Sequence, residues 1–225
     1  RLKSMLKTNK LDVDERFERL RSAISGTMSN FYMARDRETK NIVGLKIAKR
    51  DKLEFFEARF KGLNKPSEGE IAVGLHHPHV VETTEFGLTT DNLPYAVMEY
   101  LDGQELADVI DRVGPLSPPR ALKLASQMCR ALAAAHSVGI IHRDLKPENI
   151  FLTVRGGTTD FVKVLDFGIA KSTEAEEARS RRLTSPGMAM GTPEYMAPEQ
   201  AAGKPADVRS DIFVFTSMTP LVMLN

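Results

Sequence analysis

The spacing of the apolar positions changes near residue 103. Before that point, short apolar runs rich in β-branched and aromatic residues alternate with polar turns, and they fall at residues 31–34, 42–47, 80–86 and 93–100. Runs of this length and composition are typical of β-strands. The first two runs flank a polar turn at residues 36–41, and they are predicted to form an antiparallel hairpin.

Helical spacing appears in three other stretches. Residues 51–75 are rich in Glu, Phe, Leu and Ala and predict a helix that is interrupted near residues 62–66. Residues 104–112 predict a short helix. A longer helix is expected to open at Ser117-Pro118-Pro119 and to run to about residue 137, because serine is a good N-cap and proline fits the first helical turn.

Strands first and helices afterwards favour an α+β fold with two lobes. We expect residues 1–18 to be a charged, solvated N-terminal extension, residues 19–99 a β-rich N-terminal lobe and residues 100–225 a mainly helical C-terminal lobe.

Composition narrows the class of protein. The chain has 225 residues, of which 42% are hydrophobic and 27% charged, as in ordinary globular domains. A net charge of +1 gives no general attraction to nucleic acid or acidic membranes, and no apolar run is long enough for a membrane span. The single cysteine, Cys129, is expected inside a buried helix and forms no internal disulfide, which favours a cytoplasmic location.

The most informative residues lie in three ordered motifs. His142-Arg143-Asp144-Leu145-Lys146-Pro147-Glu148-Asn149 is followed by Leu165-Asp166-Phe167-Gly168 and then by Gly191-Thr192-Pro193-Glu194-Tyr195-Met196-Ala197-Pro198-Glu199. In this order they resemble the eukaryotic-like, Hanks-type serine/threonine protein kinases over residues 19–213. The lysine two residues after Asp144 resembles the serine/threonine branch.

The resemblance implies an enzyme that transfers the γ-phosphoryl group of ATP to a serine or threonine hydroxyl of a protein substrate. It implies that Asp144 orients the acceptor hydroxyl, that Lys146 steadies the γ-phosphate and that Asn149 and Asp166 hold Mg²⁺. Oxygen ligands of this kind suit a small, hard cation.

A lysine and a glutamate are expected to act together upstream. Val43-Gly44-Leu45-Lys46 resembles the strand whose lysine contacts the α- and β-phosphates. Its partner in the family is a glutamate on a helix, which the spacing places at Glu68, with Glu70 as the alternative. The counter-charge would hold the lysine in position near the phosphates.

The nucleotide site is implied by further matches. Met98 resembles the gatekeeper, and the backbone of Glu99 and Leu101 would meet the adenine edge. The residues that match adenine, ribose and phosphate-loop positions are Phe31, Gly44, Phe151, Glu105 and Gly26. For Glu105 the alternative is an exposed helix residue with no role in binding. Gly26 is the only one of the family's three loop glycines that this chain has in the phosphate-covering loop.

Regulation is implied by the segment that follows Gly168. Thr184 and Ser185 match positions that are commonly phosphorylated, and Arg143 is the residue type that pairs with a phosphate; the alternative is that both hydroxyls are solvated loop residues. Thr192 resembles the threonine that bridges Asp144 and Lys146.

The chain departs from the family in its C-terminal part. Residues 207–213 resemble the start of the long central helix of the family's C-terminal lobe, and Pro220 is expected to break this helix where the family continues it. Asp211 matches a buried carboxylate that anchors the catalytic loop, but the later helices of the lobe are not found in this sequence, so the lobe is expected to be incomplete and Glu199 to lack its arginine partner. Phe213 is then expected to be exposed. A nucleotide-binding pseudokinase or scaffold is therefore the alternative function. A small-molecule phosphotransferase is disfavoured by the substrate-docking motif Ala197-Pro198-Glu199.

Overall fold

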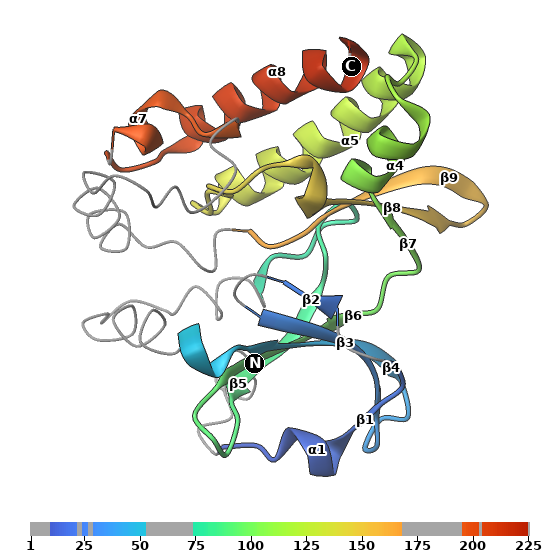
Figure 1. Cartoon of the computed structure of the whole chain (residues 1–225), viewed down its shortest axis with the longest axis vertical. Helices are drawn as coiled ribbons and strands as arrows, with labels where there is room; N and C mark the ends of the chain where they lie inside the picture. The colour runs from blue at the N-terminus through green and yellow to red at the C-terminus, as the bar shows by residue number, and fades with distance from the viewer. Residues whose placement is uncertain are drawn as a thin grey trace. The chain divides into compact units, whose positions relative to one another are not determined.

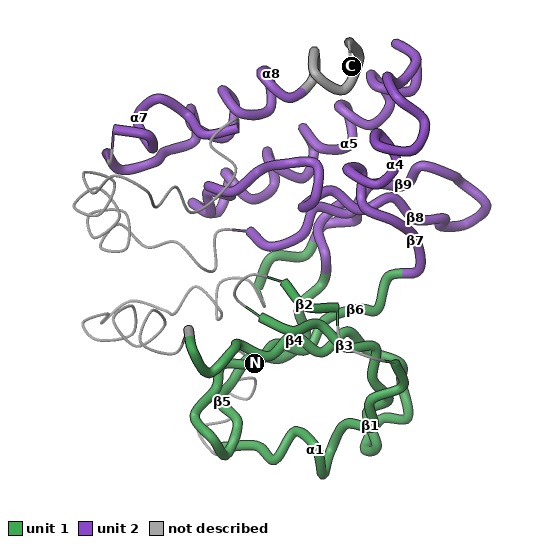
Figure 2. Tube along the Cα trace, in the orientation of Figure 1, with its two compact units in different colours: residues 1–76, 82–101 green, residues 77–81, 102–225 purple. Residues whose placement is uncertain are grey.

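The computed structural model describes residues 10–21, 24–26, 29–52, 74–167, 195–202 and 204–224, the last six by their backbone. Contacts divide the chain into two compact units (Figure 2). Unit 1 consists of Arg1–His76 and Glu82–Leu101, and unit 2 consists of His77–Val81 and Asp102–Asn225.

Unit 1 is built on an antiparallel sheet with the strand order β1-β3-β4-β6-β5, in which β2 pairs with β3. Its described elements are α1 (Val13–Arg16), β1 (Phe17–Arg19), β2 (Ile24–Ser25), β3 (Ser29–Asp36), β4 (Ile42–Ala48), the 3₁₀ turn η2 (Arg50–Lys52), β5 (Thr83–Leu88) and β6 (Pro94–Glu99).

The predicted hairpin is confirmed by β3 and β4. The two strands pair in antiparallel register from Ser29 opposite Ala48 to Arg35 opposite Ile42. The connecting turn is closed by Asp36, whose carboxylate accepts a hydrogen bond from the Glu38 amide at 2.8 Å. An aspartate that bonds to its own backbone two residues on is a common turn former, and this explains why the polar segment turns here.

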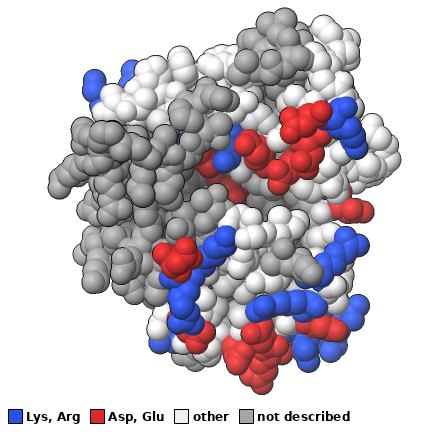
Figure 3. Space-filling model, in the orientation of Figure 1, with Lys and Arg blue, Asp and Glu red and all other residues white. Residues whose placement is uncertain are grey.

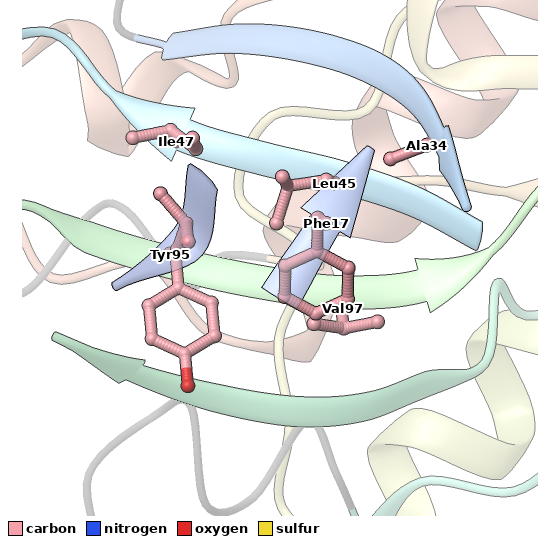
Figure 4. Packing of buried hydrophobic residues seen from close by; sticks show 7 residues of the cluster. Phe17, Ala34, Leu45, Ile47, Tyr95 and Val97 are labelled. Carbon is pink, nitrogen blue, oxygen red and sulfur yellow. The ribbon is translucent and has the colours of Figure 1, made fainter. Parts of the chain in front are cut away.

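The N-terminal segment is part of the core of unit 1, and our expectation of a solvated extension is wrong for residues 11–18. Phe17 is 1% exposed and packs with Leu45 and Val97 on one face of the sheet (Figure 4). Val13 is also buried. The high charge of the segment concealed these two apolar positions, which lie four residues apart.

The ion pairs of Arg16 allow the charged segment of residues 11–18 to pack against the core of unit 1. Its guanidinium pairs with Asp36 at 2.9 Å and with Glu85 at 2.8 Å, and all three side chains are largely shielded from solvent. Burial would raise the pKa of Asp36, but hydrogen bonds from Arg16 and from the backbone outweigh it and hold that pKa below its ordinary value. The charges are therefore satisfied within the unit, as buried ion pairs require.

Unit 2 combines a three-stranded antiparallel sheet, in the order β7-β8-β9, with helices (Figure 1). Its described elements are β7 (Gly103–Glu105), α4 (Leu106–Val113), α5 (Pro118–Ser137), the 3₁₀ turn η3 (Pro147–Asn149), β8 (Ile150–Arg155), β9 (Thr158–Val164), α7 (Pro198–Ala201) and α8 (Val208–Leu224). The β8–β9 hairpin interrupts the helical part of the chain.

The predicted helices of unit 2 are present, with one change of boundary. The short helix begins at Leu106 and not at Gln104, because residues 103–105 pair with β8 as strand β7. Gly103 permits this close approach: a Cβ atom there would lie 2.1 Å from the Leu152 carbonyl oxygen. The longer helix, α5, starts at Pro118 as expected.

Cys129 is exposed, and our prediction of a buried cysteine is wrong. The buried stripe of α5 includes Leu124, Met128, Ala131 and Ala135, with the spacing of three and four residues that one helix face requires. Cys129 follows Met128 directly and is therefore rotated by about 100° away from that stripe.

The last described helix, α8, continues through Pro220 to Leu224, so the predicted break is wrong. Proline removes one backbone donor from the helix, and here the loss of one bond does not end it. Val214 and Met218 are buried, whereas Phe213 is 44% exposed as predicted. Within the described part of the chain, no helix has both the length and the apolarity to cross a membrane.

Residues 77–81 dock on β9 and not on the sheet of unit 1. The Val81 amide donates to the Val164 carbonyl at 3.0 Å, and the Val164 amide donates to the His79 carbonyl at 2.8 Å. The strand predicted at residues 80–86 therefore starts only at Thr83. The buried imidazole of His79 lies 3.0 Å from the Val162 carbonyl oxygen through Nδ1, so Nδ1–H is the donor.

Because His79 is buried where residues 77–81 dock on β9, we predict that the free energy of unfolding falls in mild acid. Burial lowers the pKa of His79, and the nearby charges of Arg130, Lys163 and Arg155 lower it further, against the opposing hydrogen bond to Val162. The unfolded chain therefore binds a proton at this histidine more readily than the folded chain does. The contribution of His79 to the free energy of unfolding is complete above its ordinary pKa of 6.5 and is lost as the pH falls below that value. Between about pH 7.5 and 5.5 we therefore expect the free energy of unfolding to fall because of His79.

Urea unfolding at the two pH values measures this loss, and His79→Asn isolates it. Asparagine keeps an amide donor for Val162 but carries no proton at acid pH. The variant should show a smaller loss of stability than the parent on acidification. An equal loss in both proteins would assign the acid sensitivity to other groups, such as His77 and His142, whose pKa values are also lowered by burial.

Candidate active site

The catalytic loop of unit 2 is anchored by Asp211, as the sequence predicted. Asp211 lies on α8 and is 1% exposed. Its two carboxylate oxygens accept hydrogen bonds at 2.8 Å from the backbone amides of His142 and Arg143. His136, on the last turn of α5, approaches the same carboxylate at 2.7 Å through Nε2. Three separate parts of the chain thus meet at one buried carboxylate.

His142 connects this loop to the segment that carries Asp166. Its imidazole is fully buried, and Nε2–H donates to the Leu165 carbonyl at 2.8 Å. Nδ1 therefore accepts, and it does so from the Asp144 amide at 3.3 Å. The ring also packs against Phe167, with 4.8 Å between centroids. Burial lowers the pKa of His142, although the nearby carboxylate of Asp211 acts in the opposite direction. The lowered pKa favours the neutral imidazole that these hydrogen bonds require.

Asp144, Lys146 and Asn149 are brought together as predicted. The ammonium of Lys146 lies 3.9 Å from Oδ2 of Asp144. The side-chain amide of Asn149 donates to the backbone carbonyl of Asp144 at 2.6 Å and to its Oδ2 at 3.3 Å. The Asp144 side chain is 39% exposed, so it is held by neighbours while remaining accessible to a substrate.

Asn149 and Asp166 fit the role of Mg²⁺ ligands. The Asn149 carbonyl accepts a hydrogen bond from the Leu165 amide at 2.9 Å, which places Asn149 beside the residue that precedes Asp166. Asp166 has a φ of 54°, in the left-handed region that residues with a Cβ rarely adopt. A carboxylate and an amide oxygen form a donor set that suits Mg²⁺.

In unit 1 the structure brings together the predicted gatekeeper, Met98, and two residues predicted to contact adenine, Phe31 and Gly44. A Cβ atom at Gly44 would lie 2.7 Å from Cζ of Phe31 and 3.0 Å from Cγ of Met98, so both side chains lie against this glycine. Gly44 is opposite Met98 in the pairing of β4 with β6. A larger residue at position 44 would displace both neighbours.

Lys46 lies two residues further along β4, opposite Phe31 of β3 and Ala96 of β6. Its side chain is half-buried. Glu99 ends β6, and its amide donates to the Glu82 carbonyl at 2.9 Å. Leu101, also half-buried, follows two residues later.

Gly26 lies in the connection between β2 and β3. Its amide donates to the Ser29 carbonyl at 2.9 Å, and the residue is exposed. A Cβ atom at Gly26 would lie 3.2 Å from the same carbonyl oxygen, so a side chain is only narrowly accommodated.

Glu105 and Phe151 are direct partners in the pairing of β7 with β8. Burial raises the pKa of the Glu105 carboxyl, and the charges of Asp108 and Glu148 raise it further, against the opposing charge of Lys146. Figure 3 shows acidic side chains gathered on the visible face of unit 2. Glu105 is half-buried at the start of α4, so it is not merely an exposed helix residue.

Other predicted residues fall differently. Glu68, Glu70, Thr184, Ser185 and Thr192 lie outside the described residues. Arg143 is half-buried with a φ of 63°. The Glu199 carboxylate, which was expected to lack its arginine partner, accepts a hydrogen bond from the Ser210 hydroxyl, and this bond lowers the pKa of Glu199. Ser210 lies in the first turn of α8 and was not recognised from the sequence as a donor to this carboxylate.

Two residues at this site were missed from the sequence. His136 contacts the anchoring carboxylate, and Gln200 donates from its side chain to the Arg143 carbonyl at 2.9 Å. For His136 a signal existed, since it lies at the C-terminal end of the helix that leads into the catalytic loop. For Gln200 no comparable signal exists, because a glutamine after Ala197-Pro198-Glu199 is an ordinary helix residue.

Comparison with known proteins identifies the family. Residues 17–223 match the protein kinase domain family. The chain is 42% identical over 190 residues to the serine/threonine-protein kinase pkn3 of Myxococcus xanthus. This alignment covers 84% of this chain and 34% of that protein. It is 38% identical over 193 residues to PknB of Mycobacterium tuberculosis strain H37Rv, with 84% and 29% covered. The chain thus spans about a third or less of the length of these curated relatives.

A solved structure shows the same fold. The crystal structure of the Mycobacterium tuberculosis PknI kinase domain matches with a TM-score of 0.69 and 26% identity, and the match covers 91% of this chain and 72% of that chain. The β-sheet of unit 1 and the helices of unit 2 are therefore those of the protein kinase fold. Together with the match over residues 17–223, this shows that the chain belongs to the protein kinase domain family and is related to bacterial serine/threonine kinases.

Proposed function

We propose that the chain transfers the γ-phosphoryl group of ATP to serine or threonine hydroxyls of a protein substrate. The observation that carries this proposal is the group formed by Asp144, Lys146 and Asn149, which hydrogen bonds and an ion pair hold together beside the segment that leads to Asp166. A protein that served only as a binding scaffold would not need these three residues to be held together. Units 1 and 2 are proposed to be the N- and C-terminal lobes of the kinase.

In this mechanism, Asp144 accepts a hydrogen bond from the acceptor hydroxyl and directs its oxygen towards the phosphoryl group. The 3.3 Å bond from Asn149 and the 3.9 Å approach of Lys146 restrict where the carboxylate can lie. Lys146 adds positive charge where the transferring group becomes more negative. Mg²⁺, held by Asn149 and Asp166, would supply further charge neutralisation for the phosphates.

Unit 1 supplies the residues proposed for the nucleotide. Lys46 is proposed for the α- and β-phosphates, with Glu68 as its partner, and Gly26 for the loop that covers the phosphates. Phe31, Gly44 and Met98 form a contiguous apolar group that suits the face of a planar base. From unit 2, Phe151 and Glu105 are proposed for adenine and ribose, respectively.

Substrate and regulation are proposed at the level that the family supports. The curated relatives are named serine/threonine kinases, which favours a protein hydroxyl as the acceptor. Thr184 and Ser185 are proposed as regulatory phosphorylation sites that pair with Arg143, and Thr192 is proposed to bridge Asp144 and Lys146. A single cysteine supports a cytoplasmic location.

The test is phosphoryl transfer from labelled Mg·ATP to an unfolded protein rich in serine, threonine and tyrosine, followed by identification of the labelled amino acids. We expect phosphoserine and phosphothreonine. Label on tyrosine alone would contradict the serine/threonine assignment. Label found only on small alcohols or sugars supplied as competing acceptors would instead identify a small-molecule phosphotransferase.

A further inference from the structure

The side chain of Gln200 joins two backbone segments of unit 2. Its Nε2 donates to the Arg143 carbonyl at 2.9 Å, and its Oε1 accepts a longer bond of 3.4 Å from the Ala197 amide. Gln200 lies on α7, directly after Ala197-Pro198-Glu199, and is half-buried. One amide group therefore connects the start of α7 with the residue that precedes Asp144.

The peptide bond between Arg143 and Asp144 is held at both of its polar atoms. Its N–H donates to Nδ1 of His142 at 3.3 Å, and its carbonyl accepts from Gln200. The two preceding amides, of His142 and Arg143, are held by Asp211. A restraint on the carbonyl matters because it limits the ψ angle of Arg143, and the positions of the Asp144 Cα atom and side chain depend on that angle.

The backbone at this peptide is also strained. Arg143 has a φ of 63°, a conformation that is uncommon and energetically unfavourable for a residue with a Cβ. Such a conformation persists only where neighbouring groups hold it in place. The bond from Gln200 to the Arg143 carbonyl is one of these restraints, and it is the one that comes from α7.

We propose that Gln200 is a positioning residue for catalysis. Its side-chain amide orients the peptide that carries Asp144 and thereby couples α7 to the catalytic aspartate. This role rests on the proposed kinase function of Asp144. The α7 helix belongs to the motif that resembles the substrate-docking segment of the family. Gln200 would therefore make the position of Asp144 depend on the position of that segment.

Only an amide satisfies both contacts of Gln200. The Arg143 carbonyl needs a donor and the Ala197 amide needs an acceptor. In Gln200→Glu the donor is replaced by a carboxylate oxygen that repels the Arg143 carbonyl, with little change of shape. Gln200→Met has a similar length, no charge and no donor. An effect shared by both variants is therefore due to the lost donor and not to the new charge.

Gln127 offers a matched control within the same unit. Its Nε2 donates to the Asp160 carbonyl at 2.9 Å, and its Oε1 accepts from the Val162 amide at 3.1 Å. It thus bridges α5 and β9 with the same chemistry as Gln200, but it touches neither Arg143 nor Asp144. Gln127→Glu should lower stability without moving the catalytic aspartate.

Steady-state kinetics with a protein substrate and direct measurement of ATP binding test the assignment, each well below the unfolding temperature. We expect both Gln200 variants to lower kcat about 10-fold, because small displacements of a catalytic group carry large rate costs. The dissociation constant of Mg·ATP should stay within about twofold of the parent value. Gln127→Glu should keep the parent kcat. Hydrogen exchange at the amides of residues 142–144 should accelerate in the Gln200 variants and stay unchanged in Gln127→Glu.

Parent-like kcat and parent-like exchange in both folded Gln200 variants would overturn the proposal. Loss of cooperative unfolding in both variants would also overturn it, since Gln200 would then be needed for folding. If the parent itself transferred no phosphoryl group, the proposed function would fail. The exchange measurement would then still decide whether Gln200 holds this peptide, so the two failures are distinguishable.

Discussion

Replacing Asp166 by asparagine is expected to lower Mg²⁺-dependent phosphoryl transfer by about 10²- to 10³-fold, because the change removes a negative charge from the proposed metal site. Asparagine preserves the size of the side chain, and the φ of 54° at this position is tolerated by asparagine better than by most residues. The fold should therefore survive while metal-dependent ATP binding weakens. Titration of ATP binding against Mg²⁺ concentration, together with turnover, measures both effects.

Asp111→Asn is the matched control for this charge removal. Asp111 lies on the exposed side of α4 in the same unit, so the same chemical change there should leave binding and turnover at the parent level. If Asp166→Asn bound and turned over Mg·ATP like Asp111→Asn, the assignment of Asp166 as a metal ligand would be wrong.

Replacing Asp144 by asparagine should affect a different step. We expect kcat for protein phosphorylation to fall by about 10²- to 10⁴-fold, because a neutral amide cannot take up the proton of the acceptor hydroxyl as a carboxylate can. ATP affinity should remain near the parent value, since Asp144 acts on the acceptor and not on the nucleotide. The separation of kcat from ATP affinity distinguishes this residue from Asp166. An equal loss of ATP affinity would make Asp144 a structural residue.

The sequence predicted the β3–β4 hairpin, the helix from Pro118 and the anchoring role of Asp211 because each depends on local signals or on a motif. Turn residues, apolar spacing and N-terminal caps act over a few positions, so one sequence displays them. The grouping of Asp144, Lys146 and Asn149 was predictable for the same reason, since all three lie within six residues of one loop.

The failures concern contacts between distant residues. Phe17 is buried in a segment whose Arg16 pairs with Asp36 and Glu85, which lie 20 and 69 residues away, and nothing in the charged segment itself reveals those partners. Gln200 reaches a carbonyl 57 residues earlier in the chain. The docking of residues 77–81 on β9 likewise depends on a pairing across more than 80 positions. Such partners are chosen by the tertiary fold, which spacing rules do not capture.

The most direct test of the proposed function measures Mg·ATP binding and phosphoryl transfer to protein in the same preparation of the chain, for the parent and for Asp144→Asn. We predict that both proteins bind Mg·ATP with similar affinity and that only the parent places phosphate on serine or threonine. A parent that bound Mg·ATP yet transferred no phosphate, and so matched Asp144→Asn, would contradict the kinase assignment and indicate a nucleotide-binding scaffold.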